Sequence, residues 1–310
     1  MDADVSLQNA QSSAQDSPGL SAAAEGSNPH ADSAVSDHVA AQAQVTFAPG
    51  EPAHLRTYSE WDPRSAPATY TLAGINVAVF LWMLLHGVSL QSPTPPQLLH
   101  FGANDSVLVL EGQWYRLLTA TFVHIGIIHI GTNMWCLWNL GLLGEPLLGP
   151  FGLLAVYMLT GIAGNMLSLA WDVILAHLLH VPLTAVAGVG AGASGAVFGI
   201  AGILIVLLSN HRLPIPWTEL KRLRKSVVRF AGINLVIGLS TVLPLFGSLL
   251  GARIDNTAHI GGFLCGLALG PGLLTKMTAG RDRYLGRQKL VFFGAAFLLA
   301  LFGYWIANLK

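Results

Sequence analysis

Two short motifs place a serine and a histidine, the residue types of nucleophilic catalysis, in apolar parts of this sequence. Ser194 lies in the run GASG at 192–195, and His259 lies in the run AHIGG at 258–262. A serine hydroxyl is a weak nucleophile until a neighbouring base removes its proton, and histidine is the commonest base. To accept that proton, His259 must be largely neutral at rest. The motifs therefore predict covalent catalysis, provided that the fold brings the hydroxyl oxygen within about 2.6–3.2 Å of an imidazole nitrogen.

A third group of polar residues lies in the apolar run TFVHIGIIHIGTNMWCLW at 121–138. His129 and Asn133 are four residues apart, so on a helix their side chains share a face. Donors that converge there can stabilise the oxyanion of a tetrahedral intermediate, where one donor is typically worth about 3 kcal/mol. His124 falls on a different part of the helix surface, roughly 140° away from His129. We expect His124 to serve the local structure.

A zinc site is the alternative interpretation of these histidines. The sequence contains no HExxH motif, and no carboxylate lies near the face that His129 and Asn133 share. Cys136 and Cys265 lie in apolar runs without a CxxC pair, which favours small packing residues over metal ligands. We therefore expect no metal and no cofactor.

The elements that must position these residues are membrane helices. Hydrophobic residues make up 53% of the 310 residues and charged residues only 10%, against about 25% in an average soluble domain. A helix needs about 20 predominantly apolar residues to span a bilayer. Seven stretches meet that requirement, which predicts an all-α polytopic membrane protein: 70–90, 117–142, 149–171, 190–209, 230–250, 257–275 and 289–308.

Glycines at four-residue spacing follow both motifs. Gly195 and Gly199 form one pair, and Gly262, Gly266 and Gly270 continue the second motif. Small residues at this spacing let two membrane helices approach closely, which a hydrogen bond between two helices requires. The alternative is purely structural, since such glycines are common packing devices and a membrane serine often bonds only to its own backbone.

The basic residues predict an orientation. Most of the 16 lysines and arginines lie in 211–230 and 276–289, and Arg56 and Arg64 precede the first span. The positive-inside rule places these regions and the N-terminus in the cytoplasm and the C-terminus outside. Ser194 and His259 then lie a few residues into helices that both start on the outer side, several ångströms below the membrane surface. We interpret the basic runs as membrane flanks and expect no nucleic-acid partner.

Three regions divide the chain. Residues 1–65 are rich in Ala, Ser, Asp, Gly and Pro, which predicts a disordered tail without a signal or transit peptide. Residues 66–276 hold six of the spans, and 277–310 hold a basic connection and the seventh. The acidic tail without targeting features favours a bacterial inner membrane, with a eukaryotic secretory membrane as the alternative.

Taken together, the motifs resemble the rhomboid family of intramembrane serine proteases over about 68–276. The resemblance rests on elements in the family's order: WYR at 114–116, the HxxxxHxxxN spacing of His124, His129 and Asn133, Glu145, GxSG at 192–195 and AHxxGxxxG at 258–266.

The resemblance implies a six-helix core with one additional C-terminal helix. It implies that Ser194 and His259 act as a dyad without an acid, and that the Ser194 N–H, His129 and Asn133 form the oxyanion hole. It further implies that single-pass transmembrane proteins in the lipid bilayer are cleaved near the outer face.

Structural roles near the site are also implied by the resemblance. Arg116 and Glu145 would hold structure, and Gly192 and Gly195 belong to the nucleophile motif. Phe198 stands where some family members have a tyrosine, and it can still pack under the imidazole. We expect Asp255, four residues before His259, to be structural and not the acid of a triad.

Two other functions are weighed against a protease. A catalytically inactive rhomboid-like protein, acting in binding or trafficking, typically lacks the serine or the histidine, and both are present here. A transporter would be consistent with glycine-rich helices and intramembrane histidines, but the seven uneven spans show no inverted repeat.

Overall fold

A computed structural model describes residues 65–240, 255–274 and 279–309 of the chain. All of these residues belong to one unit, Ala40–Lys310. The tail predicted for 1–65, except its last residue, lies outside the described residues. So does the second half of the fifth predicted span.

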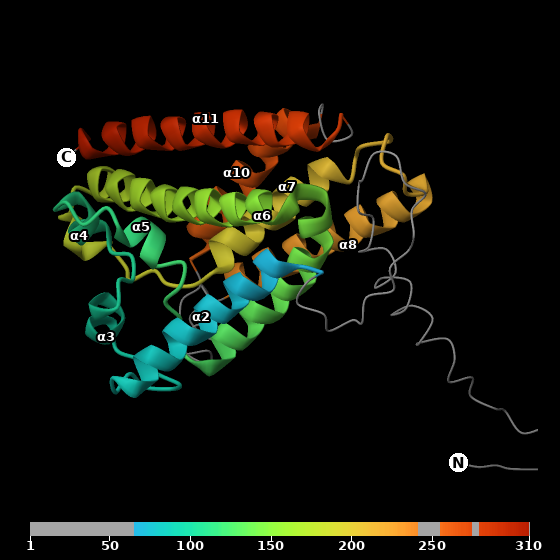
Figure 1. Ribbon diagram of the computed structural model, residues 1–310. Coiled ribbons are helices and arrows are strands. Elements are labelled where there is room, and N and C mark those ends of the chain that lie inside the picture. Colours follow the sequence, from blue (N-terminus) through green and yellow to red (C-terminus); the bar gives the residue numbers. More distant parts are fainter. Residues whose placement is uncertain (1–64, 241–254, 275–278, 310) are drawn as a thin grey trace, which may run out of the picture. The chain divides into compact units, whose positions relative to one another are not determined.

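The described residues form helices and contain no β-strand, which confirms the predicted fold class (Figure 1). Four of the helices are long and apolar enough to cross a membrane: α2, α6, α10 and α11. The helices run in the order α2 Pro67–Leu85, α3 Pro95–His100, α4 Ser106–Leu110, α5 Arg116–Thr119, α6 Ile127–Leu179, α7 Ser194–Leu207, α8 Trp217–Ser240, α10 Asn256–Leu274 and α11 Arg281–Ala307, with a 3₁₀ turn at Leu183–Ala185.

Helix α6 comprises the second and third predicted spans. Its 53 residues are interrupted at Gly149, whose φ of 72° is not helical, and Pro150 follows directly. The break leaves the Leu148 carbonyl available to Gln288 of α11, whose Nε2 donates to it at 2.6 Å. Gln288 is fully buried, so this bond also provides a partner for a polar group that would be costly in a membrane helix. The C-terminal helix is therefore joined to the core by a buried polar contact.

Two predicted spans begin too early. The second was expected from 117, but α6 begins at Ile127, because α5 and a turn at Gly126 with φ of 84° precede it. The fourth was expected from 190, but Gly192 has φ of 131° and α7 begins at Ser194. Hydropathy responds to apolar composition and does not register such left-handed backbone, which favours glycine.

The basic segment after α7 is helical. Residues 217–229, expected as part of a connection, form the first half of α8. Leu220 and Val227 pack in the core, whereas five cations on this stretch are exposed: Lys221, Arg222, Arg224, Lys225 and Arg229. This amphipathic pattern is that of a helix with one face on the protein and one face in water or lipid headgroups.

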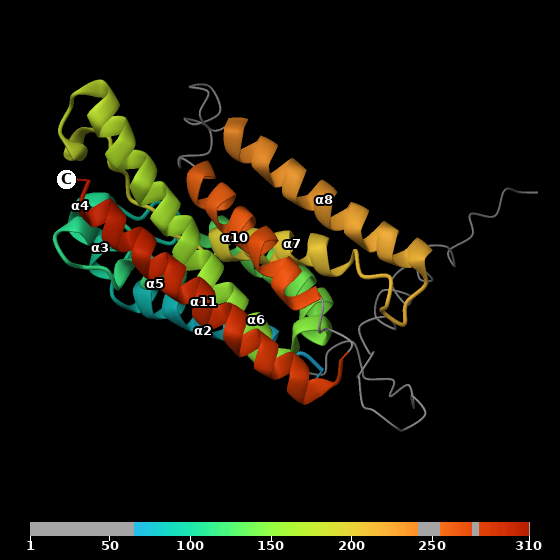
Figure 2. The same cartoon turned by 90° about the horizontal axis from the view of Figure 1, so that it is seen from above.

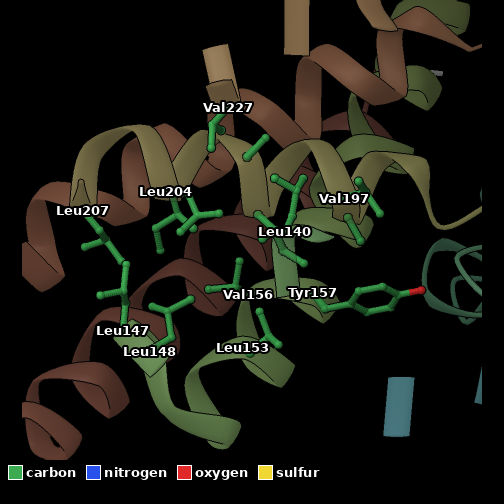
Figure 3. Packing of buried hydrophobic residues seen from close by; sticks show 14 of the residues in the cluster. Leu140, Leu147, Leu148, Leu153, Val156, Tyr157, Val197, Leu204, Leu207 and Val227 are labelled. Atoms are coloured by element: carbon green, nitrogen blue, oxygen red, sulfur yellow. The ribbon is translucent and has the colours of Figure 1, made fainter. Parts of the chain in front are cut away.

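Helix α7 is the central helix of the described structure. Every residue from Gly195 to Leu204 is buried, as expected for a helix that is apolar on all sides. It packs on α6 and α10, and Figure 2 shows α8 and α11 on opposite sides of α10. Figure 3 shows part of the hydrophobic core between α6 and α7, where Val156 and Tyr157 of α6 lie near Val197 and Leu204 of α7. The site residues on α7 and α10 are thus carried by closely packed helices.

Candidate active site

Ser194 and His259 lie at the same end of two helices that pack against each other. Ser194 is the first residue of α7 and is half-buried, and His259 is the fourth residue of α10 and is buried. The expectation that Ser194 lies a few residues into its helix is wrong, because the loop before it is not helical. Ser194 therefore follows directly on a loop whose backbone can line the site.

The predicted glycines set the distance between α7 and α10. A Cβ atom added at Gly262 would overlap the carbonyl of Gly195, and one added at Gly266 would overlap the carbonyl of Gly199. The backbones of the two helices therefore touch at two successive turns. No other residue type fits at these positions without moving one helix away from the other.

We predict that Gly262→Ala destabilises the protein by about 1–3 kcal/mol, because the added methyl group meets backbone that cannot move aside. Unfolding of the purified protein in detergent measures the change. Gly294→Ala on α11 is the matched control, since a Cβ there meets nothing within 4 Å. Equal stability of the two variants would contradict the close approach of α7 and α10.

The His259 imidazole rests on an aromatic ring from α7. The rings of Phe198 and His259 are stacked, with centroids 4.4 Å apart and planes 14° apart. Phe198 lies one turn after Ser194, so the stack holds the imidazole on the same side of α7 as the hydroxyl. Within the described part of the chain no hydrogen bond joins the two groups, and such bonds are often long when no substrate is bound.

His129 and Asn133 lie beside the loop that precedes Ser194. A Cβ atom at Gly192 would be 2.6 Å from His129 Cε1 and 3.7 Å from Asn133 Nδ2. The Ile125 N–H donates to His129 Nδ1 at 3.2 Å, which leaves the proton on Nε2. Asn133 Nδ2 donates one hydrogen to the His129 carbonyl at 3.0 Å and keeps another. Two side-chain donors thus adjoin the loop at 190–193, named the nucleophile loop after the GxSG motif at its end.

His124 also contacts this loop. It precedes α6, outside any helix, and its Nε2 accepts the N–H of Ala193 at 3.4 Å. Its Nδ1 lies 3.2 Å from the Phe122 carbonyl. Burial, and to a smaller extent the charge of His129, lowers the pKa of His124 to about 3. His124 is therefore neutral, as an imidazole that accepts one hydrogen bond and donates another must be.

Arg116 ties together the loops between α2 and α6. Its Nη1 donates to the carbonyls of Leu99 and Ala103 at 2.8 and 2.9 Å, and its Nε donates to Gln113 Oε1 at 2.7 Å. The Arg116 side chain is buried, and these acceptors take three of its five N–H groups. Such contacts fix the loops that lead into α6.

Glu145 joins α6 to the start of α2. Its carboxylate accepts the N–H groups of Ala68 and Thr69, both at 2.8 Å, and the Thr69 hydroxyl at 2.7 Å. A negative charge is favourable at a helix N-terminus, where backbone N–H groups lack partners. Glu145 is buried, and none of these partners belongs to the nucleophile loop. Its contacts are therefore structural.

Sequence patterns missed the groups that hold the nucleophile loop. Asn104 and Gly190 exchange two backbone hydrogen bonds, at 2.8 and 2.9 Å, and the Gly192 N–H donates to the Ala120 carbonyl at 2.9 Å. Neither Asn104 nor Ala120 carries a motif, so no local signal marks them. Among the described residues, no three histidine, cysteine, aspartate or glutamate side chains gather as a metal site would require.

The fold and the site define a polytopic α-helical membrane protein with a serine and a histidine on adjoining helices. Residues 111–276, more than half of the chain, match the Rhomboid domain family. The chain belongs to the rhomboid family. Helix α11 lies beyond the matched residues.

Three relatives illustrate the match. The rhomboid protease GluP of Bacillus subtilis is 31% identical over 74% of this chain and 39% of its own length. The rhomboid protease AarA of Providencia stuartii is 28% identical over 69% of this chain and 75% of its own. Rhomboid-like protease 2 of Toxoplasma gondii is 32% identical over 63% of this chain and 62% of its own length. The chain thus spans well under half the length of GluP.

Proposed function

We propose that this protein is an intramembrane serine endopeptidase in which Ser194 is the nucleophile and His259 its base. The proposal is supported chiefly by the stack of His259 on Phe198, which holds a base on the side of α7 that carries the serine. The family's relatives are named as proteases, which supports the same activity.

The proposed mechanism uses two proton transfers by His259. The imidazole takes the Ser194 proton as the oxygen attacks a peptide carbonyl, and then gives it to the leaving amine. The Ser194 N–H and the side chains of His129 and Asn133 donate to the oxyanion. Water then hydrolyses the acyl-enzyme, with His259 again as the base. No acid takes part, and the buried Nδ1 of His259 has no partner among the described residues.

The length of α7 supports cleavage near the outer membrane face. Its 14 residues extend about 21 Å, roughly 9 Å less than the hydrocarbon core of a bilayer. With the C-terminal end of α7 at the cytoplasmic surface, Ser194 lies that far below the outer surface. The exposed cations of α8 and Arg281 and Arg283 of α11 support this orientation. Single-pass transmembrane segments are the substrates that reach this depth.

A bacterial inner membrane is part of this proposal, although the family's members also come from a plant and from Toxoplasma. An inactive binding or trafficking protein is the alternative. The presence of both Ser194 and His259 argues against it.

Two measurements on the full chain in liposomes test the activity. A reporter with one transmembrane segment should be cut at a bond near its outer end, as product masses will show. A fluorophosphonate should add to Ser194 and stop cleavage. An uncut reporter together with an unmodified Ser194 would support the inactive alternative. Cleavage that continues while Ser194 is fully modified would exclude Ser194 as the nucleophile.

A further inference from the structure

Asp255 connects the helix that carries His259 to another helix. It directly precedes α10, and its Oδ1 accepts the Ala258 N–H at 2.9 Å, as an N-cap side chain does. Its Oδ2 accepts the hydroxyl hydrogen of Ser168, in the second half of α6, at 2.5 Å. Its backbone carbonyl accepts the His259 N–H at 3.2 Å. One residue thus caps α10 and bonds it to α6.

The two carboxylate oxygens are both engaged away from the imidazole. A triad acid would accept the Nδ1–H of the histidine. The Nδ1 of His259 is buried without a partner in the described structure, whereas Asp255 bonds to Ala258 and Ser168. The geometry therefore gives Asp255 a connection to α6 and not to the base.

Glycines provide further close contacts between α10 and α6. A Cβ at Gly164 would lie 2.6 Å from the Ala258 carbonyl, and one at Gly261 would lie 2.9 Å from the Ala163 carbonyl. Such packing sets how closely the helices approach, but it is weakly directional along the helix axes. Gly164 and Ser168 are four residues apart and share one face of α6. The Ser168–Asp255 bond adds a directional contact on this face.

We propose that Ser168 and Asp255 form a clamp that fixes the position of α10 along α6 and so positions His259 against Ser194. The clamp rests on the proposed function, since it acts through His259. Asp255 is a positioning residue, and Ser168 acts through Asp255. A displacement of about 1 Å at a reacting group can lower a rate by 10²-fold, so loss of one directional bond here has a measurable effect.

Three substitutions of Asp255 separate the clamp from the cap and from a triad. Asp255→Asn keeps an acceptor for Ala258 and offers a donor to Ser168, so kcat should stay within about threefold of wild type. A triad would instead lose about 10⁴-fold on this change. Asp255→Ser keeps the cap but is too short to reach Ser168, and Asp255→Ala loses both contacts. We expect kcat to fall about 10-fold and about 100-fold respectively, with KM unchanged.

Ser168→Ala completes the experiment. Reporter cleavage in liposomes should fall about 10-fold in kcat, and Ser168→Ala combined with Asp255→Ser should be no slower than either alone. The rate of fluorophosphonate addition to Ser194 should fall in parallel, because it reads the alignment of the dyad without a transmembrane substrate. Asp105→Ala is the control, since it removes the N-cap of α4 with bonds of 3.0 Å to Val107 and Leu108. It should lower the unfolding temperature without lowering kcat.

The outcomes are distinct. Wild-type kcat and labelling in both Ser168→Ala and Asp255→Ser would overturn the clamp, and a 10⁴-fold loss in Asp255→Asn would replace it with a triad. Because Asp255→Ser and Asp255→Asn both keep the cap, these results do not depend on whether Asp255→Ala folds. Cleavage that does not depend on Ser194 would overturn the proposed function, whereas failure of the clamp alone leaves that dependence intact.

Discussion

Ser194→Ala is expected to lower the rate of reporter cleavage by at least about 10⁴-fold, because no other group at the site supplies a nucleophile. His259→Ala should lower it by a similar factor, since the unassisted hydroxyl is a poor nucleophile. The double variant should be no slower than either single one, because the two groups act as a unit. Cleavage of the reporter by each variant in liposomes measures these effects.

Ser209→Ala provides the matched control for the serine. Ser209 lies just past the other end of α7, and its hydroxyl donates to the Ile205 carbonyl at 2.9 Å. The Ser209→Ala protein should cleave the reporter at the wild-type rate. A Ser194→Ala protein that unfolds like wild type and retains more than a few per cent of its activity would rule out the proposed dyad.

Asn133→Ala is expected to lower kcat by about 10²–10³-fold and to change KM little, since an oxyanion donor acts mainly in the transition state. His129→Ala should have an effect of the same order, because its Nε2–H lies beside the same loop. Both variants should still react with a fluorophosphonate, more slowly than wild type, because nucleophile and base remain. Steady-state cleavage and labelling rates distinguish these expectations from loss of the dyad.

Asn139→Ala is the control on the same helix. The Asn139 side chain donates to the Trp135 carbonyl at 2.7 Å, as Asn133 donates to the His129 carbonyl, but Asn139 is exposed. The Asn139→Ala substitution removes the same kind of local bond without changing a contact of the nucleophile loop. If Asn133→Ala and Asn139→Ala had equal kcat, Asn133 would have no part in the oxyanion hole.

The positions of the long apolar helices were largely predictable because they depend on composition over long windows. Apolar runs located α2, both halves of α6, α10 and α11, and glycine spacing indicated the contact of Gly262 with Gly195. Helix starts were less predictable. The turns at Gly126 and Gly192 lie within apolar sequence, so their left-handed backbone leaves no trace in hydropathy.

The arrangement around the site depended on contacts between distant residues. No pattern pairs Asn104 with Gly190, or Gln288 with the carbonyl that the break after Leu148 exposes. Each pair forms only after separate helices have packed. Short-range spacing carries no record of such partners.

The sequence by itself determined the candidate site residues, because Ser194, His259, His129 and Asn133 are recognisable from type and spacing within short motifs. Only the tertiary structure decided how Asp255 is used. Four residues before His259, it could have been the acid of a triad or the cap of a helix. Ser168 lies 87 positions away in sequence, and its bond to Asp255 forms only where α10 packs on α6. That contact directs the carboxylate to α6 and away from the His259 imidazole.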